Sequence, residues 1–558
     1  MASRFVLALM ACAMPRESEA LRGVTSLRQP GLNHHLRARP SLAPTPHRSS
    51  TPVLMSAISL RPGIGLLALR GGVSLPSLAR PTTPEGMFTA IFGALSLLCA
   101  AIVFQSRDKL EQQGTVVEVK PAAVKSLQLR FLAVFWLFKM ADWLQGPFFY
   151  EVYASKVING LQVSTQGVAR LFLTGFGSTA LFGAIVGGLV DSFGRKRGSL
   201  FFTLMYALSA LSTKCAQLPL LFAGRVAGGL GTSLLFSAPE AWLVSEHNRQ
   251  NLDNKYLGQT FGLAYFGDAI VAIFAGLMAG AVAKRGGPTA PFELSVFFLV
   301  AGAALVFTTW SENFGGKKQN SAVAESGEPD SDDAARDPSA RASTNGWNLV
   351  KEAVGALLKD KRIMLVGAVQ AFFEGAMYIF VLQWPPAMIK ALAGMQVPFG
   401  QIFSCFMVCC MIGSSTFSAL SKKGITAEDT LTGVHTKKKQ HAAYEPTIGM
   451  LFLATMSMAS AAASSGGALV PLVVSFFFFE VCVGMYFPLI GTLRSKYLPD
   501  AYRGVIMNLF GIPLNLIVVA VFLSIGKLGL LGALICSTTS LSIALASQLA
   551  LQVSLKRK

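Results

Sequence analysis

Long apolar stretches separated by short polar loops repeat along most of this chain of 558 residues. Each stretch has about the 20 residues that a helix needs to cross a hydrocarbon core roughly 30 Å thick. Such segments have to be helical, because lipid offers the backbone no hydrogen-bond partner. The pattern predicts an all-α integral membrane protein with spans at residues 87–105, 128–150, 168–190, 198–216, 218–244, 258–283, 290–310, 363–390, 400–420, 447–464, 468–492, 504–525 and 528–552.

Two polar segments interrupt this pattern and divide the chain. Residues 1–85 are rich in arginine, serine and proline, lack lysine, and start with a short apolar run at 5–14. Such a run is typical of a signal peptide and the remainder of an organelle transit peptide, so we expect a leader or a disordered tail. Residues 311–362 combine an acidic stretch with a short amphipathic helix, which predicts a cytosolic linker. One extra helix and a first six-helix half therefore occupy 86–310, and a second six-helix half occupies 363–558.

Composition serves mainly to exclude alternatives. Charged residues make up 14% of the chain, against about 25% in soluble domains. The net charge of +19 comes from the leader and from short loops, among them the loop to which we assign Arg494. No basic face is interleaved with aromatic residues, so we exclude nucleic acid as a partner. Lysine and arginine favour one alternate set of loops, which predicts that these loops, the linker and the C-terminus face the cytosol. The eight cysteines show no CxxC or Cys/His spacing, so we expect neither disulfides nor a bound metal.

A short basic loop joins the third and fourth spans. Its residues Gly187, Asp191, Gly194, Arg195 and Lys196 resemble, in type and spacing, the cytosolic loop motif of the major facilitator superfamily. The glycines permit a tight turn and close helix packing. Asp191 can accept hydrogen bonds from a facing helix N-terminus, while Arg195 can hold the loop by an ion pair. We therefore predict that this loop latches the two halves together in one conformation, a role that positive-inside charge alone does not explain.

The fifth span contains Arg225, followed by Gly228, Gly229 and Gly231. An arginine inside a span is energetically expensive and should face a cavity or a carboxylate. The glycines alone could reflect packing, so the arginine carries the signal. The segment resembles the fourth-helix motif of the same superfamily, which favours a functional role.

Further blocks give a more specific resemblance. They lie at residues 141–147, 235–242, 246–247, 373–380 and 484–488. Together with the loop motif they resemble the eukaryotic molybdate-anion transporter family over roughly residues 87–550, and the extra leading helix matches as well. The resemblance implies a secondary active transporter that imports molybdate, the oxyanion needed for molybdenum cofactor. Lys139, beside the first block, is not part of the family pattern.

These observations leave several functions open. The leading hypothesis is a monomer that moves molybdate by alternating access around a midplane site in the bilayer. The alternatives are a transporter of another small anion such as sulfate, and a non-transporting receptor or scaffold of the same fold. The chain shows no nucleophile–base or metal constellation, so we expect neither an enzyme nor a cofactor. The resemblance favours the plasma membrane, whereas the leader favours a plastid envelope or endomembrane.

Polar side chains inside the spans are the candidates for substrate binding and coupling. A tetrahedral dianion needs cations and hydrogen-bond donors rather than a metal. The candidate cations are Arg225 and Lys139, the candidate donors are Gln145, Gln370, Tyr378, Asn508 and Asn515, and the carboxylates are Asp142, Glu240, Glu374 and Glu480. A structural alternative is mutual neutralisation, with Lys139 on Asp142 and Arg225 on a carboxylate.

The charge of the expected cargo sets an energetic requirement. Moving each negative charge into an inside-negative compartment costs about 2.3 kcal/mol per 100 mV. Import of a dianion therefore needs a driving ion or trapping inside. A protonatable carboxylate among the four could couple protons.

Overall fold

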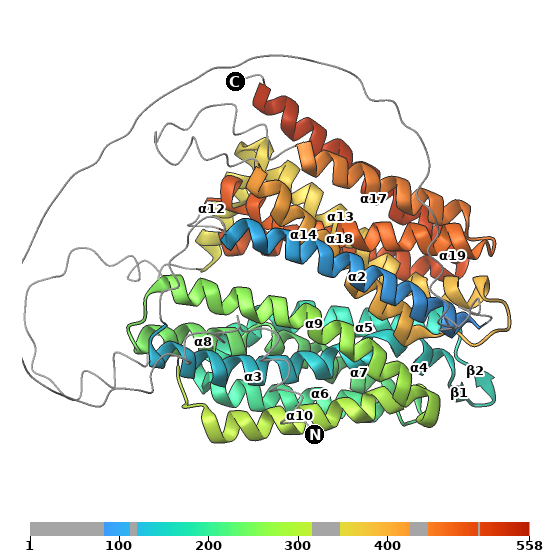
Figure 1. Cartoon of the computed structure of the whole chain (residues 1–558), viewed down its shortest axis with the longest axis horizontal. Helices are drawn as coiled ribbons and strands as arrows, with labels where there is room; N and C mark the ends of the chain where they lie inside the picture. The colour runs from blue at the N-terminus through green and yellow to red at the C-terminus, as the bar shows by residue number, and fades with distance from the viewer. Residues whose placement is uncertain (1–82, 112–119, 315–345, 424–444, 500–502, 557–558) are drawn as a thin grey trace, which may run out of the picture. The chain divides into compact units, whose positions relative to one another are not determined.

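A computed structural model of the chain describes residues 83–111, 120–314, 346–423, 445–499 and 503–556. Nearly all of this part is helical (Figure 1). The predicted leader lies outside the described residues apart from its last three positions, and so does most of the predicted linker. Of the linker, the structure describes residues 311–314 and 346–362, which include the amphipathic helix α12 (Gly346–Lys359).

The first half of the chain forms the helices predicted for it. They are α3 (Ala122–Gln145), α5 (Thr165–Phe193), α6 (Arg195–Ser212), α7 (Leu218–Leu235) with its continuation α8 (Ala238–Arg249), α9 (Asn254–Gly286) and α10 (Ala290–Thr309). Between α3 and α5 lie η1 (Gly146–Phe148), α4 (Glu151–Ala154) and an antiparallel hairpin of β1 (Val157–Ile158) and β2 (Leu161–Gln162). Asn159 and Gly160 both have positive φ, as a two-residue hairpin turn of this twist requires.

The second half consists of α13 (Lys361–Ala391), α14 (Phe399–Lys423), α17 (Glu445–Ala463), α18 (Leu469–Tyr497) and α19 (Arg503–Lys556). Two predicted spans share α19, and the backbone leaves helical geometry at Gly529, near the predicted start of the second span, where φ is 61°. One further helix, α2 (Pro84–Glu111), precedes both halves and packs against α14. By length and composition alone, eight of the described helices could cross a membrane, and α2 is among them.

The helices pack as two bundles of six. In the first bundle α7 contacts α5 and α6, while α10 contacts α3 and α6; in the second, α13 contacts α19 and α14 contacts α18. Glycine makes the closest of these crossings possible, because small residues let membrane helices approach backbone to backbone. A Cβ at Gly484 of α18 would collide with the carbonyl oxygen of Cys410 on α14. These two bundles match the predicted fold class.

Contacts between the bundles gather toward the end that carries the β1–β2 hairpin (Figure 1). The hydroxyl of Ser404 on α14 donates to the Ile273 carbonyl on α9 at 2.9 Å, and a Cβ at Gly400 would collide with the α9 backbone. On the other side of the interface, the ring of Phe176 on α5 meets that of Tyr378 on α13, with centroids 4.8 Å apart. The bundles are therefore joined by a glycine-lined crossing and an aromatic contact.

Candidate functional site

The first polar cluster lies inside the N-terminal bundle, around Lys139 of α3. Its ammonium lies 3.7 Å from the Asp142 carboxylate, one turn along the same helix. It also lies 3.5 Å from the carboxylate of Asp268 on α9. Trp143 Nε1 donates to Asp268 at 2.7 Å, and the Tyr206 hydroxyl of α6 donates to Asp142. One ammonium thus serves two carboxylates.

Sequence reasoning placed Lys139 beside Asp142 but missed Asp268. The two aspartates meet only because α3 packs against α9, and helix pairing is not visible in a single sequence. A signal was nevertheless present, since Asp268 is an ionisable residue within the predicted span 258–283.

Arg225 of α7 forms a second polar feature. Its side chain is buried, and Nη2 donates to the Ser209 hydroxyl of α6 at 2.8 Å. The guanidinium lies over the Phe149 ring, 4.4 Å from the centroid, and 5.9 Å from that of Tyr153. Within the described residues Nε has no hydrogen-bond partner, and neither has the Tyr153 hydroxyl.

Gly228, one helical turn after Arg225, leaves the space that the arginine side chain occupies. A Cβ at Gly228 would lie 2.5 Å from Nη2 of Arg225 and 2.6 Å from the Ser209 hydroxyl. The structural alternative, neutralisation of Arg225 by a carboxylate, is not found in the described part of the chain. Aromatic faces and one hydroxyl surround the cation instead, so its positive charge is not cancelled.

The third cluster lies inside the C-terminal bundle, around Arg494 of α18. Its Nε donates to the Gln370 side chain at 3.0 Å, and Nη2 donates to Glu374 at 3.3 Å; both partners are on α13. The Tyr486 hydroxyl also donates to Glu374, at 2.8 Å. We had assigned Arg494 to a loop, and that was wrong: α18 continues to Tyr497, five residues past the predicted end. One cation here meets one carboxylate.

The remaining predicted residues are dispersed rather than gathered. Gln145 donates to Ser295 of α10 at 3.1 Å, Glu240 accepts from Tyr265 at 2.7 Å, and Glu480 accepts from the Cys410 thiol at 2.9 Å. Tyr378 belongs to the interface between the bundles. Asn515 is exposed on α19, and the side chain of Asn508 lies outside the described part. The predicted polar residues therefore do not form one site in this conformation.

The basic loop is anchored within its own bundle. Asp191 accepts hydrogen bonds from Arg195, at 3.0 and 2.7 Å, as predicted for the ion pair. The N-terminus of α6 is capped by Glu312, which follows α10 and accepts from the amides of Lys196 and Arg197 at 2.8 and 3.2 Å. Sequence reasoning missed this cap. Glycine is required at 194, because φ is 109° and a Cβ would lie 2.5 Å from Glu312 Cδ. Gly187 lies within α5.

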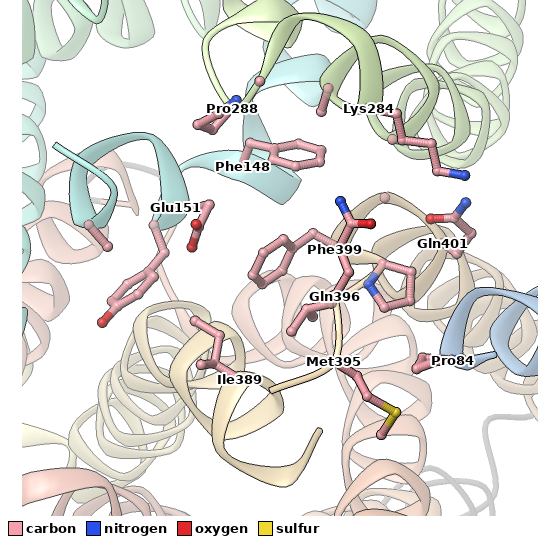
Figure 2. Close-up of a pocket in the computed structure, with 18 of the residues that line it drawn as sticks. Pro84, Phe148, Glu151, Lys284, Pro288, Ile389, Met395, Gln396, Phe399 and Gln401 are labelled. Carbon is pink, nitrogen blue, oxygen red and sulfur yellow. The ribbon is translucent and has the colours of Figure 1, made fainter. Parts of the chain in front are cut away.

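A cavity of about 1140 Å³ opens at the hairpin end, between η1, α4, α9 and the start of α14 (Figure 2). Its charged lining residues are Glu85, Glu151 and Lys284. Glu85 of α2 pairs with Lys284 of α9 and accepts from the Gln401 amide of α14 at 3.1 Å. Burial raises the pKa of the Glu151 carboxyl. Two carboxylates and one ammonium make this lining unsuitable for a dianion.

Comparison with known proteins agrees with this architecture. Residues 87–343 and 337–470 match a family described as sugar transporters with twelve transmembrane helices. An auto-inhibited POT-family peptide transporter superposes with a TM-score of 0.56 at 12% identity, covering 78% of this chain and 97% of that one. A peptide transporter solved in complex with sulfate gives 0.55 at 16% identity, covering 78% and 95%. A D-xylose–proton symporter gives 0.52 at 12% identity, covering 77% and 97%. At such identities these likenesses establish the fold, which is that of the major facilitator superfamily.

Sequence relatives give a narrower assignment. The molybdate-anion transporter of Xenopus tropicalis is 30% identical over 405 residues, covering 71% of this chain and 78% of the relative. That of Takifugu rubripes is 30% identical over 439 residues, covering 77% and 85%. The fold, the loop motif and these relatives identify a multi-pass membrane transporter rather than an enzyme. The chain belongs to the molybdate-anion transporter family of the major facilitator superfamily.

Proposed function

We propose that this protein imports molybdate by secondary active transport, with Arg225 as the cation that binds the oxyanion. The names of its relatives support the substrate. The observation that carries the proposal is that Arg225 is buried and has no carboxylate partner within the described residues.

Lys139, Arg494 and Arg225 differ in how much positive charge remains to attract an anion. Lys139 lies between two carboxylates, and Arg494 binds one. A dianion gains little from either, because the positive charge is already neutralised. Arg225 retains its positive charge in a place where water does not screen it. The orphan Nε and the Tyr153 hydroxyl add unused donors beside it, which oxyanion oxygens can accept.

The position of the contacts between the bundles supports alternating access. These contacts lie toward the hairpin end, whereas the basic loop at Asp191 lies at the other end of α5. In the orientation predicted from loop charges, the hairpin end faces outward. The bundles are then in contact within their outer halves, while the cavity at the hairpin end opens outward. For the empty site to open to the outside again, the helices that cross at Gly400 must separate, and so must the rings of Phe176 and Tyr378.

The charge of the substrate also determines what must drive its transport. A dianion moved into a negative compartment needs a driving ion or trapping inside, and we propose that protons are the driving ion. The apolar helix α2 is taken to cross the membrane ahead of the twelve core helices. The protein acts as a monomer in the plasma membrane, with the plastid envelope or an endomembrane as the alternative location.

The test is uptake of labelled molybdate in cells that lack their own molybdate transporters. We expect Arg225→Ala to lower initial uptake at least about tenfold, because losing a hydrogen bond to a charged group costs about 1.5–3 kcal/mol. Arg225→Lys should keep partial uptake, since lysine retains the charge but not the planar fork. Excess unlabelled tungstate and sulfate in the same assay measure how selective the site is among tetrahedral oxyanions.

The matched control is Arg285→Ala, which removes an exposed cation at the end of α9. Surface labelling must show that all variants reach the membrane in equal amounts. Normal uptake by Arg225→Ala would remove Arg225 from the substrate site.

A further inference from the structure

The cluster around Lys139 carries an excess of negative charge deep in the N-terminal bundle. The Lys139 side chain is 8% exposed, and the carboxylates of Asp142 and Asp268 are 25% and 15% exposed. With all three groups ionised, the cluster holds a net charge of −1. Such a charge inside a span is expensive unless a positive charge joins it.

The hydrogen bonds show where that charge can be added. One oxygen of each carboxylate already accepts from a neighbour, Tyr206 for Asp142 and Trp143 for Asp268. The other oxygens face the ammonium at 3.7 and 3.5 Å, longer than the roughly 2.7–2.9 Å of a close charge-assisted hydrogen bond. The ammonium is therefore shared between the carboxylates rather than committed to either.

We propose that Asp142 and Asp268 together bind one transported proton, so that this cluster is the coupling site of the transporter. Binding of one proton from the outer solution changes the cluster from −1 to neutral, and the ammonium then pairs with the carboxylate that stays ionised. Release to the inner solution reverses this. The proton is shared by the pair, as expected for two interacting carboxylates.

The surroundings favour a proton over a metal cation. The ammonium already occupies the space between the two carboxylates, and the described residues contain no group of three or more acidic, histidine or cysteine ligands. Around the cluster, α6 contributes Tyr206, α9 contributes Tyr265, and α8 contributes Glu240, which accepts from Tyr265. Through Tyr265, Glu240 brings a further carboxylate into this part of the bundle.

Helix α6 connects this cluster to the anion site. Tyr206, which donates to Asp142, lies one turn before Ser209, which accepts from Arg225. A change in the charge of Asp142 alters its hydrogen bond with Tyr206. A shift of Tyr206 moves α6, and with it Ser209, which binds Arg225. In this respect the inference rests on the proposed function, because it presumes that an anion binds at Arg225.

The other carboxylates are less suited to coupling. Glu374 is matched by Arg494, so it has no excess charge to neutralise. Glu480 has the Cys410 thiol as its described partner and lacks a nearby described cation. An ionised carboxylate there would have no described cation beside it, so releasing a proton costs more than it does beside Lys139.

The experiment uses full-length protein in proteoliposomes with two assays on labelled molybdate. Counterflow, with unlabelled molybdate inside, measures anion movement without a driving gradient. Accumulation under an inward proton gradient measures coupling, and one pH unit supplies up to about tenfold accumulation per coupled proton. Asp268→Asn and Asp142→Asn each fix one position in a neutral, proton-like state. We expect both to retain counterflow and to lose the accumulation driven by the proton gradient.

Asp253→Asn, at the start of the helix α9 that carries Asp268, is the matched control. Asp253 caps α9 through the Lys255 amide, and asparagine caps equally well, so accumulation should stay at the wild-type value. Two outcomes overturn the proposal: full proton-driven accumulation in both cluster variants, or wild-type accumulation driven by a sodium gradient instead. Absence of counterflow in the wild-type protein refutes molybdate transport itself, which separates that failure from a failure of the coupling site.

Discussion

The two bundles treat buried charge differently. In the C-terminal bundle Arg494 meets Glu374, one cation for one carboxylate, with Gln370 and Tyr486 completing the hydrogen bonds. In the N-terminal bundle Lys139 meets two carboxylates, while Arg225 meets none within the described residues. In a matched pair the two charges already cancel, so neither group gains much by binding or releasing an ion. The unmatched groups are those that a dianion or a proton can complete, so we propose that the N-terminal bundle binds both.

The largest test of this contrast is Arg494→Met. Removing one partner of a buried pair leaves the other uncompensated, which costs about 3–5 kcal/mol. Glu374 is 15% exposed, so we expect a value near the lower end of that range. Thermal unfolding of the purified protein in detergent measures the loss as a lower Tm.

The double variant Arg494→Met with Glu374→Gln is the control for this prediction. It removes both charges and should recover most of the Tm, because an uncharged replacement of a buried pair is often neutral. Equal Tm values for the single variant and the wild-type protein would show that Glu374 does not depend on Arg494.

Arg225→Met should behave in the opposite way, with a smaller effect on stability and a larger one on ligand binding. Its described contacts are a hydroxyl and aromatic faces, so its removal should change the free energy of unfolding by only about 1 kcal/mol. Molybdate at 100 times its Kd should stabilise the wild-type protein by about 2.7 kcal/mol. This stabilisation by molybdate should vanish in Arg225→Met and persist in Arg494→Lys. If molybdate still stabilises Arg225→Met, the anion binds elsewhere.

The sequence was sufficient to predict the helices, because apolar length and loop composition are local properties. The two spans that share α19 were separated correctly around Gly529, and the ends of most helices lie within a few residues of their predicted positions. The fold class followed from this count and from the loop motif.

The partners of the polar residues were not predictable in the same way. Asp268 reaches Lys139 only through the packing of α3 on α9, which no local pattern encodes. Arg494 was misread because basic residues near the end of a span also mark a cytosolic loop. The cap that Glu312 provides to α6 depends on how α10 ends beside the basic loop. The Asp268 and Glu312 misses concern contacts between distant segments, whereas the Arg494 miss concerns where α18 ends.

The smallest predicted effect concerns the place where both bundles meet α2. Glu85 pairs with Lys284 of the N-terminal bundle and accepts from Gln401 of the C-terminal bundle, so it joins the two regions at the hairpin end. The Glu85 and Lys284 side chains are 44% and 46% exposed, and exposed pairs contribute about 0.2–1 kcal/mol. Glu85→Gln should therefore lower Tm slightly, and the exchanged pair Glu85→Lys with Lys284→Glu should restore it. Because exposed pairs are screened by ions, the difference should shrink at high salt. A salt-independent difference would instead attribute the effect to the hydrogen bond with Gln401, which joins α2 to the C-terminal bundle alone.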